Sequence, residues 1–279
     1  MAKETTKLVE YPSGALIPER DVHLMPVLEA RHLGIDFGGL SAVEDFSLTL
    51  GATEIAGLIG PNGAGKTTVF NLLTNVYQPT RGSIMIHGYN TAGKSSYQVN
   101  KMGIARTFQN IRLFKDLSVI DNVKVGLHNH LNESMLDALT HLFRYNRQEK
   151  IAKENALELL DFFDLADSAD VMAGNLPYGD QRKLEIVRAL ATGPRILLLD
   201  EPAAGMNPHE TEGLMDTILK IRDTFQISVL LIEHDMNLVM GVCEGICVMN
   251  FGKVIAKGTP NEIKNNPIVI EAYLGKKEA

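Results

Sequence analysis

The sequence predicts an α/β protein with a mostly parallel core sheet, an antiparallel β region near the N-terminus and a helical subdomain inserted into the core. Short apolar runs without alternation, such as "EIAGLIG", "RILLLD" and "ISVLLIEH", are typical of strands covered on both faces. Helical patterns around 180–192 and 208–224 lie between such runs, and this alternation favours a doubly wound sheet. Residues from roughly 111 to 176 carry helical patterns alone, which predicts the inserted subdomain.

The elements can be assigned in chain order. The N-terminus is polar and interrupted by prolines, and it lacks the apolar stretch of a signal peptide. From Val27 the runs "VLEARHLGIDF" and "SAVEDFSLTL" are strand-like with partial alternation, and "TPNEIKNNPIVIEAYLG" predicts two short C-terminal helices. We therefore expect an N-terminal tail over 1–26, an α/β core over 27–110 and 177–260, a helical subdomain over 111–176, and a C-terminal helical segment and tail over 261–279.

Composition excludes some classes of partner. Asp and Glu outnumber Lys and Arg by 34 to 27, and because no long basic stripe is present we expect no nucleic-acid partner. The two cysteines, Cys243 and Cys247, predict buried thiols in a reducing compartment and no disulfide framework. No apolar run approaches the roughly 20 residues that a membrane helix needs.

The stretch "GPNGAGKTT" matches the P-loop pattern between a predicted strand and a predicted helix. Its glycines let successive backbone N–H groups point at phosphate oxygens. Lys66 is expected to reach the β- and γ-phosphates, and Thr67 to place its hydroxyl on Mg²⁺. The predicted nucleotide-binding residues of this loop are Gly60, Asn62, Gly63, Ala64, Gly65, Lys66, Thr67 and Thr68.

The run "LLLDEP" supplies two adjacent acids at the end of a buried strand. Adjacent residues at a strand end point in different directions, so the two carboxylates can have separate tasks. Asp200 is predicted to hold Mg²⁺ through a water molecule, and Glu201 to polarise the water that attacks the γ-phosphate.

A second candidate phosphate site lies in "LPYGDQRKLEIVRAL", residues 176–190. Gly179 stands at the start of a predicted helix, where backbone N–H groups and the helix dipole suit an anion. A single bound nucleotide does not explain why one chain carries two such sites.

With these motifs in place, the chain resembles the nucleotide-binding subunits of ABC transporters, a branch of the P-loop NTPases, from about Val27 to Gly275. The resemblance implies that Phe37 in "IDFGGL" stacks on adenine. It also implies that Gln109 in "RTFQN" lies near Mg²⁺ and the attacking water, and that His234 in "LLIEHD" contacts the γ-phosphate.

The same resemblance accounts for the second phosphate site. "LPYGDQ" resembles the family's signature motif, Leu-Ser-Gly-Gly-Gln, through which each subunit caps the ATP held by its partner. It implies that Tyr178, Gly179 and Asp180 contact nucleotide in trans. Pro177 replaces the family's serine and offers neither a hydroxyl nor an N–H, so capping is expected to depend on Gly179 and the amides that follow it.

The resemblance also implies a function. "GIARTFQNIRLFKDLSVIDNV", "DEPAAGMNPHET" and the ending "NPIVIEAYLG" are similar to the ATPase subunits of branched-chain amino-acid importers. We expect an ATPase on the inner face of the cell membrane that uses ATP and Mg²⁺ and acts with a second ATPase subunit, identical or related, and with membrane permease subunits. The alternatives are the ATPase of another ABC system, such as lipopolysaccharide export, and a soluble ABC ATPase outside transport.

Overall fold

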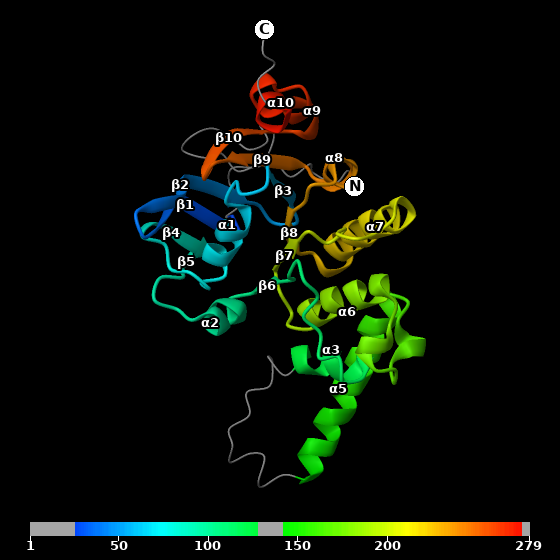
Figure 1. Cartoon of the computed structure of the whole chain (residues 1–279). Coiled ribbons are helices and arrows are strands. Elements are labelled where there is room, and N and C mark those ends of the chain that lie inside the picture. The colour runs from blue at the N-terminus through cyan, green and yellow to red at the C-terminus, as the bar shows by residue number, and fades with distance from the viewer. Residues whose placement is uncertain (1–25, 128–141, 275–279) are drawn as a thin grey trace, which may run out of the picture. The chain divides into compact units, whose positions relative to one another are not determined.

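The computed structural model of the chain describes residues 26–127 and 142–274, without the side chains of residues 142–148 (Figure 1). The expected tail over 1–26 lies almost entirely outside the described residues. The chain divides into two compact units. One is the helical unit, Thr107–Pro194, and the other, called the core unit here, contains the remaining described residues. No helix of the described residues is long and apolar enough to cross a membrane.

The predicted antiparallel region near the N-terminus is present as a four-stranded sheet in the core unit. Its strand order is β2-β1-β4-β5, and all its pairs are antiparallel. The Gly38–Gly39 turn joins the first two strands, and both glycines have the positive φ that a tight hairpin favours. The strands are β1 (Leu28–Phe37), β2 (Leu40–Leu50), β4 (Arg81–Ile86) and β5 (Tyr89–Asn90).

The second sheet of the core unit has six strands in the order β10-β9-β3-β8-β7-β6. Every pair is parallel except β9 with β10, which confirms the predicted mostly parallel core. The carboxyl ends of β3, β6, β7 and β8 therefore meet at one edge of the sheet. The strands are β3 (Ile55–Ile59), β6 (Ile104–Arg106), β7 (Ile196–Asp200), β8 (Ser228–Ile232), β9 (Gly245–Asn250) and β10 (Lys253–Gly258).

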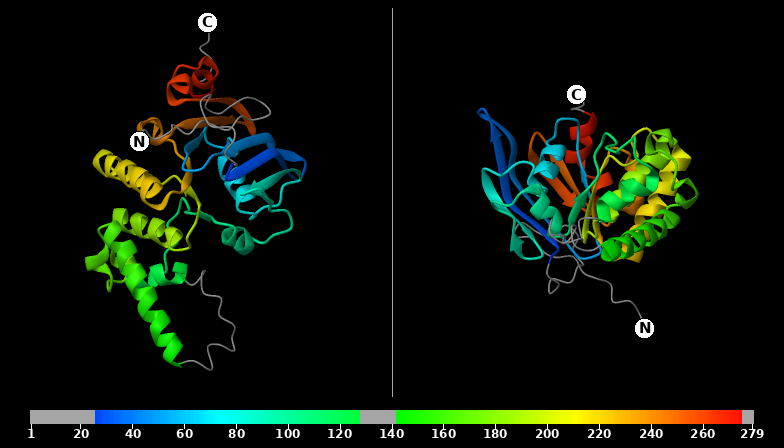
Figure 2. Two further views of the ribbon diagram at one scale, coloured as in Figure 1. Left: turned by 180° about the vertical axis from the view of Figure 1, so that it is seen from behind. Right: turned by 90° about the horizontal axis from the view of Figure 1, so that it is seen from below.

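One hydrophobic core joins the two sheets of the core unit, which lie side by side in Figure 2. Leu28, Phe46 and Leu50 of the antiparallel sheet pack in it with Phe70 of helix α1 and Leu230 of β8. The predicted buried strands β3, β7 and β8 are buried along their whole length. The helices of this unit are α1 (Lys66–Leu73), α2 (Ser96–Lys101), α7 (Pro208–Phe225), α8 (Met236–Val242), α9 (Pro260–Lys264) and α10 (Pro267–Leu274).

The helical unit is built on α3 (Val119–Leu127), α5 (Leu142–Phe162) and α6 (Tyr178–Leu190). We expected the helical subdomain to end at residue 176, but α6 also packs in this unit. The reason is a close approach at Gly126 of α3, where a side-chain Cβ would lie 2.6 Å from the carbonyl oxygen of Arg188.

Both cysteines are free and buried in the core unit, and burial raises the pKa of the Cys247 thiol to about 12.

Candidate functional site

The loop that follows β3 has the wrapped backbone that a phosphate cradle needs. Gly60, Gly63 and Gly65 have φ angles of 150°, 76° and 100°. A Cβ at Gly60 would collide with the carbonyl oxygen of Met249 on the neighbouring strand, so this position requires glycine. Gly65 forms the N-cap of α1. Asn62 and Gly63 are exposed, whereas Ala64 is buried.

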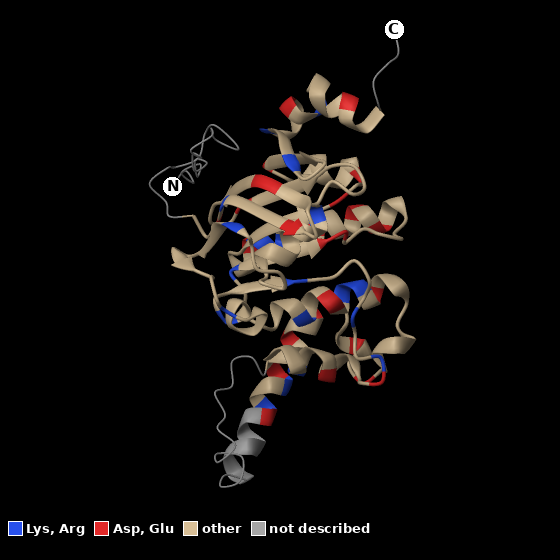
Figure 3. Ribbon diagram, turned by 60° about the vertical axis from the view of Figure 1, so that its left-hand side comes forward, with Lys and Arg blue, Asp and Glu red and all other residues tan. Residues whose placement is uncertain are grey.

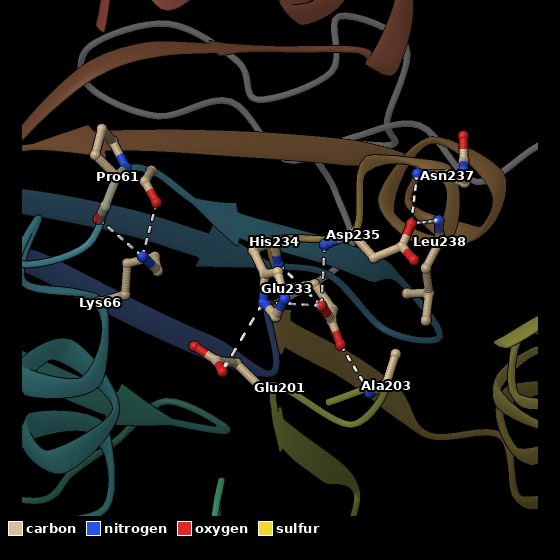
Figure 4. A network of polar contacts seen from close by, with 10 residues as sticks. Pro61, Lys66, Glu201, Ala203, Glu233, His234, Asp235, Asn237 and Leu238 are labelled. Carbon is tan, nitrogen blue, oxygen red and sulfur yellow. Dashed lines mark hydrogen bonds and ion pairs between the residues drawn. The ribbon is translucent and has the colours of Figure 1, made fainter. Parts of the chain in front are cut away.

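Lys66 opens α1 and is buried, with 8% of its surface exposed. Its Nζ donates to the carbonyl oxygens of Gly60 at 2.7 Å and Pro61 at 3.0 Å (Figure 4). Burial lowers the pKa of Lys66, and the negative charges of Glu201 and Asp200 oppose that shift. The lysine therefore lies within the field of both predicted carboxylates. Thr67 beside it is exposed, and Thr68 is half-buried.

Asp200 ends β7 and is 2% exposed. Its Oδ2 lies 2.6 Å from a guanidinium nitrogen of Arg106, the last residue of β6. Arg106 also donates to Asn71 Oδ1 of α1 at 2.7 Å, and its guanidinium carbon lies over the Phe70 ring, 5.4 Å from the ring centroid. Asp200 is thus held in one orientation between two elements of the core unit.

Glu201 follows Asp200 with a φ of 48°, a conformation that a residue with a side chain seldom adopts. Its backbone N–H donates to the carbonyl oxygen of Ile232 at 2.9 Å. Nδ1 of His234 lies 3.9 Å from Oε2 of Glu201 (Figure 4). The structure therefore brings together the predicted base and the predicted switch histidine. The exposed fractions of the two side chains are 20% and 63%, so both are accessible.

Phe37, the predicted adenine platform, ends β1 and is 45% exposed. Its ring meets the ring of Tyr77 edge to face, with centroids 5.3 Å apart and an interplanar angle of 73°. Tyr77 is 39% exposed, so the two aromatic rings form a partly open surface in the core unit. A stacking role for Phe37 stays a prediction.

The helical unit holds the remaining predicted site residues. Tyr178, Gly179 and Asp180 form the first turn of α6 after the N-cap Pro177, which provides no side-chain cap. Tyr178 is 48% exposed, and the N–H of Gln181 donates to the carbonyl oxygen of Pro177 at 2.9 Å. The amides of a first helical turn have no acceptor within the helix, so they suit an anion.

Gln109 is also exposed, and its backbone is held by α6. Arg182 donates to the carbonyl oxygen of Gln109 at 2.8 Å and to that of Phe108 at 2.7 Å. Arg182 is fully buried and pairs with Glu185, whose Oε1 accepts from the backbone N–H groups of Phe108 and Arg112. The signature-like helix therefore fixes the backbone around Gln109. This bonding explains why residues 107–110, which we placed in the core, belong to the helical unit.

Sequence reasoning missed two charged residues in the core unit, Arg106, whose side chain is 6% exposed, and the buried Glu233. Arg106 contacts Asp200, and Glu233 accepts hydrogen bonds from the backbone N–H groups of His234 and of Ala203, which lies two residues beyond Glu201. The available signal was a charged residue at the end of each apolar strand, in "GIAR" and "LLIE".

Lys and Arg lie among Asp and Glu along the described ribbon (Figure 3).

The residues present fit a magnesium ion held together with phosphate. Mg²⁺ prefers oxygen ligands and binds through one or two protein groups plus substrate phosphates and water. The Thr67 hydroxyl and the Asp200 carboxylate are such groups. The negative charge of Asp200 acts to raise the pKa of Lys66 in the phosphate loop. Among the described residues, no group of three or more His, Cys, Asp or Glu side chains is arranged to hold a metal ion by itself.

Comparison with known proteins identifies the family of the chain. Residues 43–204 match the ABC transporter family, and residues 253–279 match the branched-chain amino acid ATP-binding cassette transporter family. A solved nucleotide-free ATP-binding cassette from an ABC transporter is 30% identical, with a TM-score of 0.78 over 90% of this chain and all of that one. The ADP conformation of MJ1267, an ATP-binding cassette of an ABC transporter, is 29% identical, with the same TM-score and coverage.

Curated relatives cover nearly the whole length as well. BraF of Pseudomonas aeruginosa and LivG of Escherichia coli, both high-affinity branched-chain amino acid transport ATP-binding proteins, are 47% identical over 90% of this chain and 98% of their own. The lipopolysaccharide export ATP-binding protein LptB of Haemophilus influenzae is 32% identical over similar shares. The chain therefore belongs to the ATP-binding proteins of ABC transporters, which are ATPases, and within them to the branch of the branched-chain amino acid transport ATP-binding proteins.

Proposed function

We propose that this chain is the ATPase subunit that powers import of branched-chain amino acids. The observation that carries the proposal is the 47% identity to BraF and LivG over nearly the full length of both chains. The C-terminal family match at residues 253–279 supports the same branch. The lower identity to LptB makes lipopolysaccharide export the weaker alternative.

ATP is held by the P-loop of the core unit in this proposal. The amides of Gly60, Asn62, Gly63, Ala64 and Gly65 surround the phosphates, Lys66 turns from its carbonyl acceptors toward them, and Thr68 lies beside them. Phe37 stacks on the adenine, and its exposed ring supports that role. Magnesium is held by Thr67 and Asp200, with Gln109 nearby, and when bound it neutralises charge on the phosphates.

Hydrolysis is assigned to Glu201, with His234 and Gln109 in supporting roles. Glu201 accepts a proton from the attacking water, and its partial exposure leaves it accessible to that water. His234 contacts the γ-phosphate from the neighbouring strand end. The 3.9 Å separation between the histidine ring and the Glu201 carboxylate supports their action at one phosphate.

A second ATPase subunit, identical or related, completes each nucleotide site in this proposal. The first turn of α6 at Tyr178, Gly179 and Asp180 caps the phosphates held by the partner's P-loop, because its amides suit an anion. The helical unit then passes the motion to membrane permease subunits, which places the chain on the inner face of the cell membrane. Selection of the amino acid lies with those other subunits.

Replacement of the proposed base tests the catalytic assignment. We expect Glu201→Gln to lower ATP turnover at least about a hundredfold while leaving ATP affinity within about twofold, since an amide cannot accept the proton. Turnover is measured by phosphate release and affinity by titration with a fluorescent ATP analogue. Near-normal turnover in this variant would remove Glu201 as the base.

A further inference from the structure

Glu233 is a buried carboxylate for which the proposed function has no task. It follows β8 directly and is 1% exposed, although it carries a charge at the end of an apolar strand. Burying a carboxylate costs free energy unless hydrogen bonds compensate for the lost water. The contacts of Glu233 therefore indicate what the residue does.

Three backbone amides donate to this one side chain (Figure 4). Oε1 accepts from the N–H of Ala203 at 2.8 Å. Oε2 accepts from the N–H of His234 at 2.9 Å and from that of Asp235 at 3.2 Å. The two oxygens thus serve different segments, since Ala203 follows β7 and the other two residues follow β8. One carboxylate ties together the turns that leave two neighbouring strands.

The tied segments carry the reacting groups of the proposed site. Ala203 is two residues beyond Glu201, whose φ of 48° persists only where its surroundings fix the backbone. The bond from the Glu201 N–H to Ile232 holds the start of that segment, and Glu233 holds it again at Ala203. His234 is the next residue along the chain from Glu233. Its ring nitrogen Nδ1 lies 3.7 Å from Oε2 of Glu233.

We propose that Glu233 is a positioning residue for ATP hydrolysis, which holds the segment carrying Glu201 at a fixed distance from the turn carrying His234. It is placed to act through the backbone of these two residues rather than on the nucleotide. The inference rests on the proposed function, because it takes Glu201 as the base and His234 as the phosphate contact.

The test compares the same chemical change at two neighbouring positions in the full-length chain. In Glu233→Gln one acceptor oxygen becomes an NH₂ group, so at least one of the two segments loses its acceptor. The matched control is Asp235→Asn. Asp235 caps α8 with Oδ1 alone, which accepts from Asn237 and Leu238 and can be retained in the amide.

We expect Glu233→Gln to lower kcat by about ten- to a hundredfold, the range for lost hydrogen bonds to a charged group. Its affinity for ATP should stay within about twofold, because Lys66 and the P-loop are held by other contacts. Hydrogen exchange of the peptide 201–207 should accelerate about tenfold or more while exchange elsewhere is unchanged. Asp235→Asn should change none of these quantities.

Unchanged turnover and exchange in Glu233→Gln would overturn the proposal. So would a fall in turnover matched by an equal loss of ATP affinity and faster exchange throughout the chain, because that result describes general destabilisation. Glu201→Gln is measured in parallel. If that variant keeps its turnover the proposed function fails at the base, yet the exchange of residues 201–207 still reports whether Glu233 holds them.

If Glu233→Gln does not fold, the wild-type chain decides the question. The Ala203 amide should then exchange at least about tenfold more slowly than an amide of an unfolded chain, as a bonded and buried donor does. Exchange at the unfolded rate would overturn the proposal.

Discussion

Single charged residues organise the candidate site through the backbone as much as through their own chemistry. Lys66 donates to two carbonyl oxygens of its own loop, and Arg106 holds the Asp200 carboxylate at 2.6 Å. Glu201 adopts a strained backbone between two hydrogen-bonded turns. Asp200 and Glu201 are each held by a residue at the end of a neighbouring strand, and Lys66 is held by its own loop, which is the preorganisation that phosphoryl transfer requires.

Pro177 allows a test of the signature turn at this scale. Proline at the N-cap has no hydroxyl to donate to a phosphate, and α6 starts without a side-chain cap. Pro177→Ser should therefore leave ATP turnover equal or higher, by up to about a hundredfold, because a hydrogen bond to a charged group contributes about 1.5–3 kcal/mol. Turnover measured at saturating ATP checks this expectation. A sharp fall would show that the proline itself is needed.

The residues of the P-loop could be predicted because their spacing is local in sequence. Gly60 and Lys66 lie six residues apart, and their contacts form within the same loop. Arg106 and Asp200 are 94 residues apart and meet only when β6 and β7 pair. No local pattern marks such a contact, and only a charge at the end of an apolar strand indicates it.

At the scale of elements, the β9–β10 turn supports the phosphate loop. The N–H of Gly252 donates to the carbonyl oxygen of Ala64 at 3.0 Å, and its own carbonyl oxygen accepts from Glu44 on β2 at 2.9 Å. Gly252 has a φ of 78°, and a Cβ there would lie 2.8 Å from the carbonyl oxygen of Ala42. The turn therefore packs against the loop in a way that only glycine permits.

Two glycine substitutions distinguish the effect of this close packing from the effect of backbone strain alone. Gly252→Ala should cost about 3 kcal/mol of unfolding free energy and weaken ATP binding about tenfold, because the turn must move away from the P-loop. Gly93 has a similar φ of 72° with nothing near its missing Cβ. Gly93→Ala should cost only about 1 kcal/mol and leave ATP binding unchanged. Equal effects of the two variants on ATP binding, measured by titration, would contradict this view of the turn.

The buried pair on α6 makes a second prediction for an element. Arg182→Met should lower the unfolding free energy by about 3–5 kcal/mol, because it leaves Glu185 buried without its cation. Lys183, one residue along, pairs with Asp180 at 3.4 Å on the surface. Lys183→Ala should change stability by less than about 0.5 kcal/mol. Denaturant unfolding of both variants decides the matter, and a small effect at Arg182 would be contrary to expectation.

The same pair shows why one boundary could not be read from sequence. The apolar periodicity of α6 identifies the helix, and we assigned it to the core because it precedes β7. Its partners in space are instead α3, through Gly126, and the backbone of residues 108–112. Periodicity shows that a helix has a buried face but not which element covers that face.

The whole molecule is a core unit with the P-loop and a helical unit with the signature-like turn. We propose that two chains of this kind close over two ATP molecules. A shift from mostly open to mostly closed needs about 5.5 kcal/mol of differential binding. The proposed source of this binding free energy is the set of phosphates shared between a P-loop and the first turn of a partner's α6. Hydrolysis of ATP removes that contribution.

Turnover per chain, followed against chain concentration together with the molecular mass from light scattering, tests this claim most directly. We predict that turnover per chain falls toward zero on dilution in step with the fraction of dimer, whether the partner is a second copy or a related subunit. Full turnover in a preparation that contains only monomers would contradict a site shared between two chains.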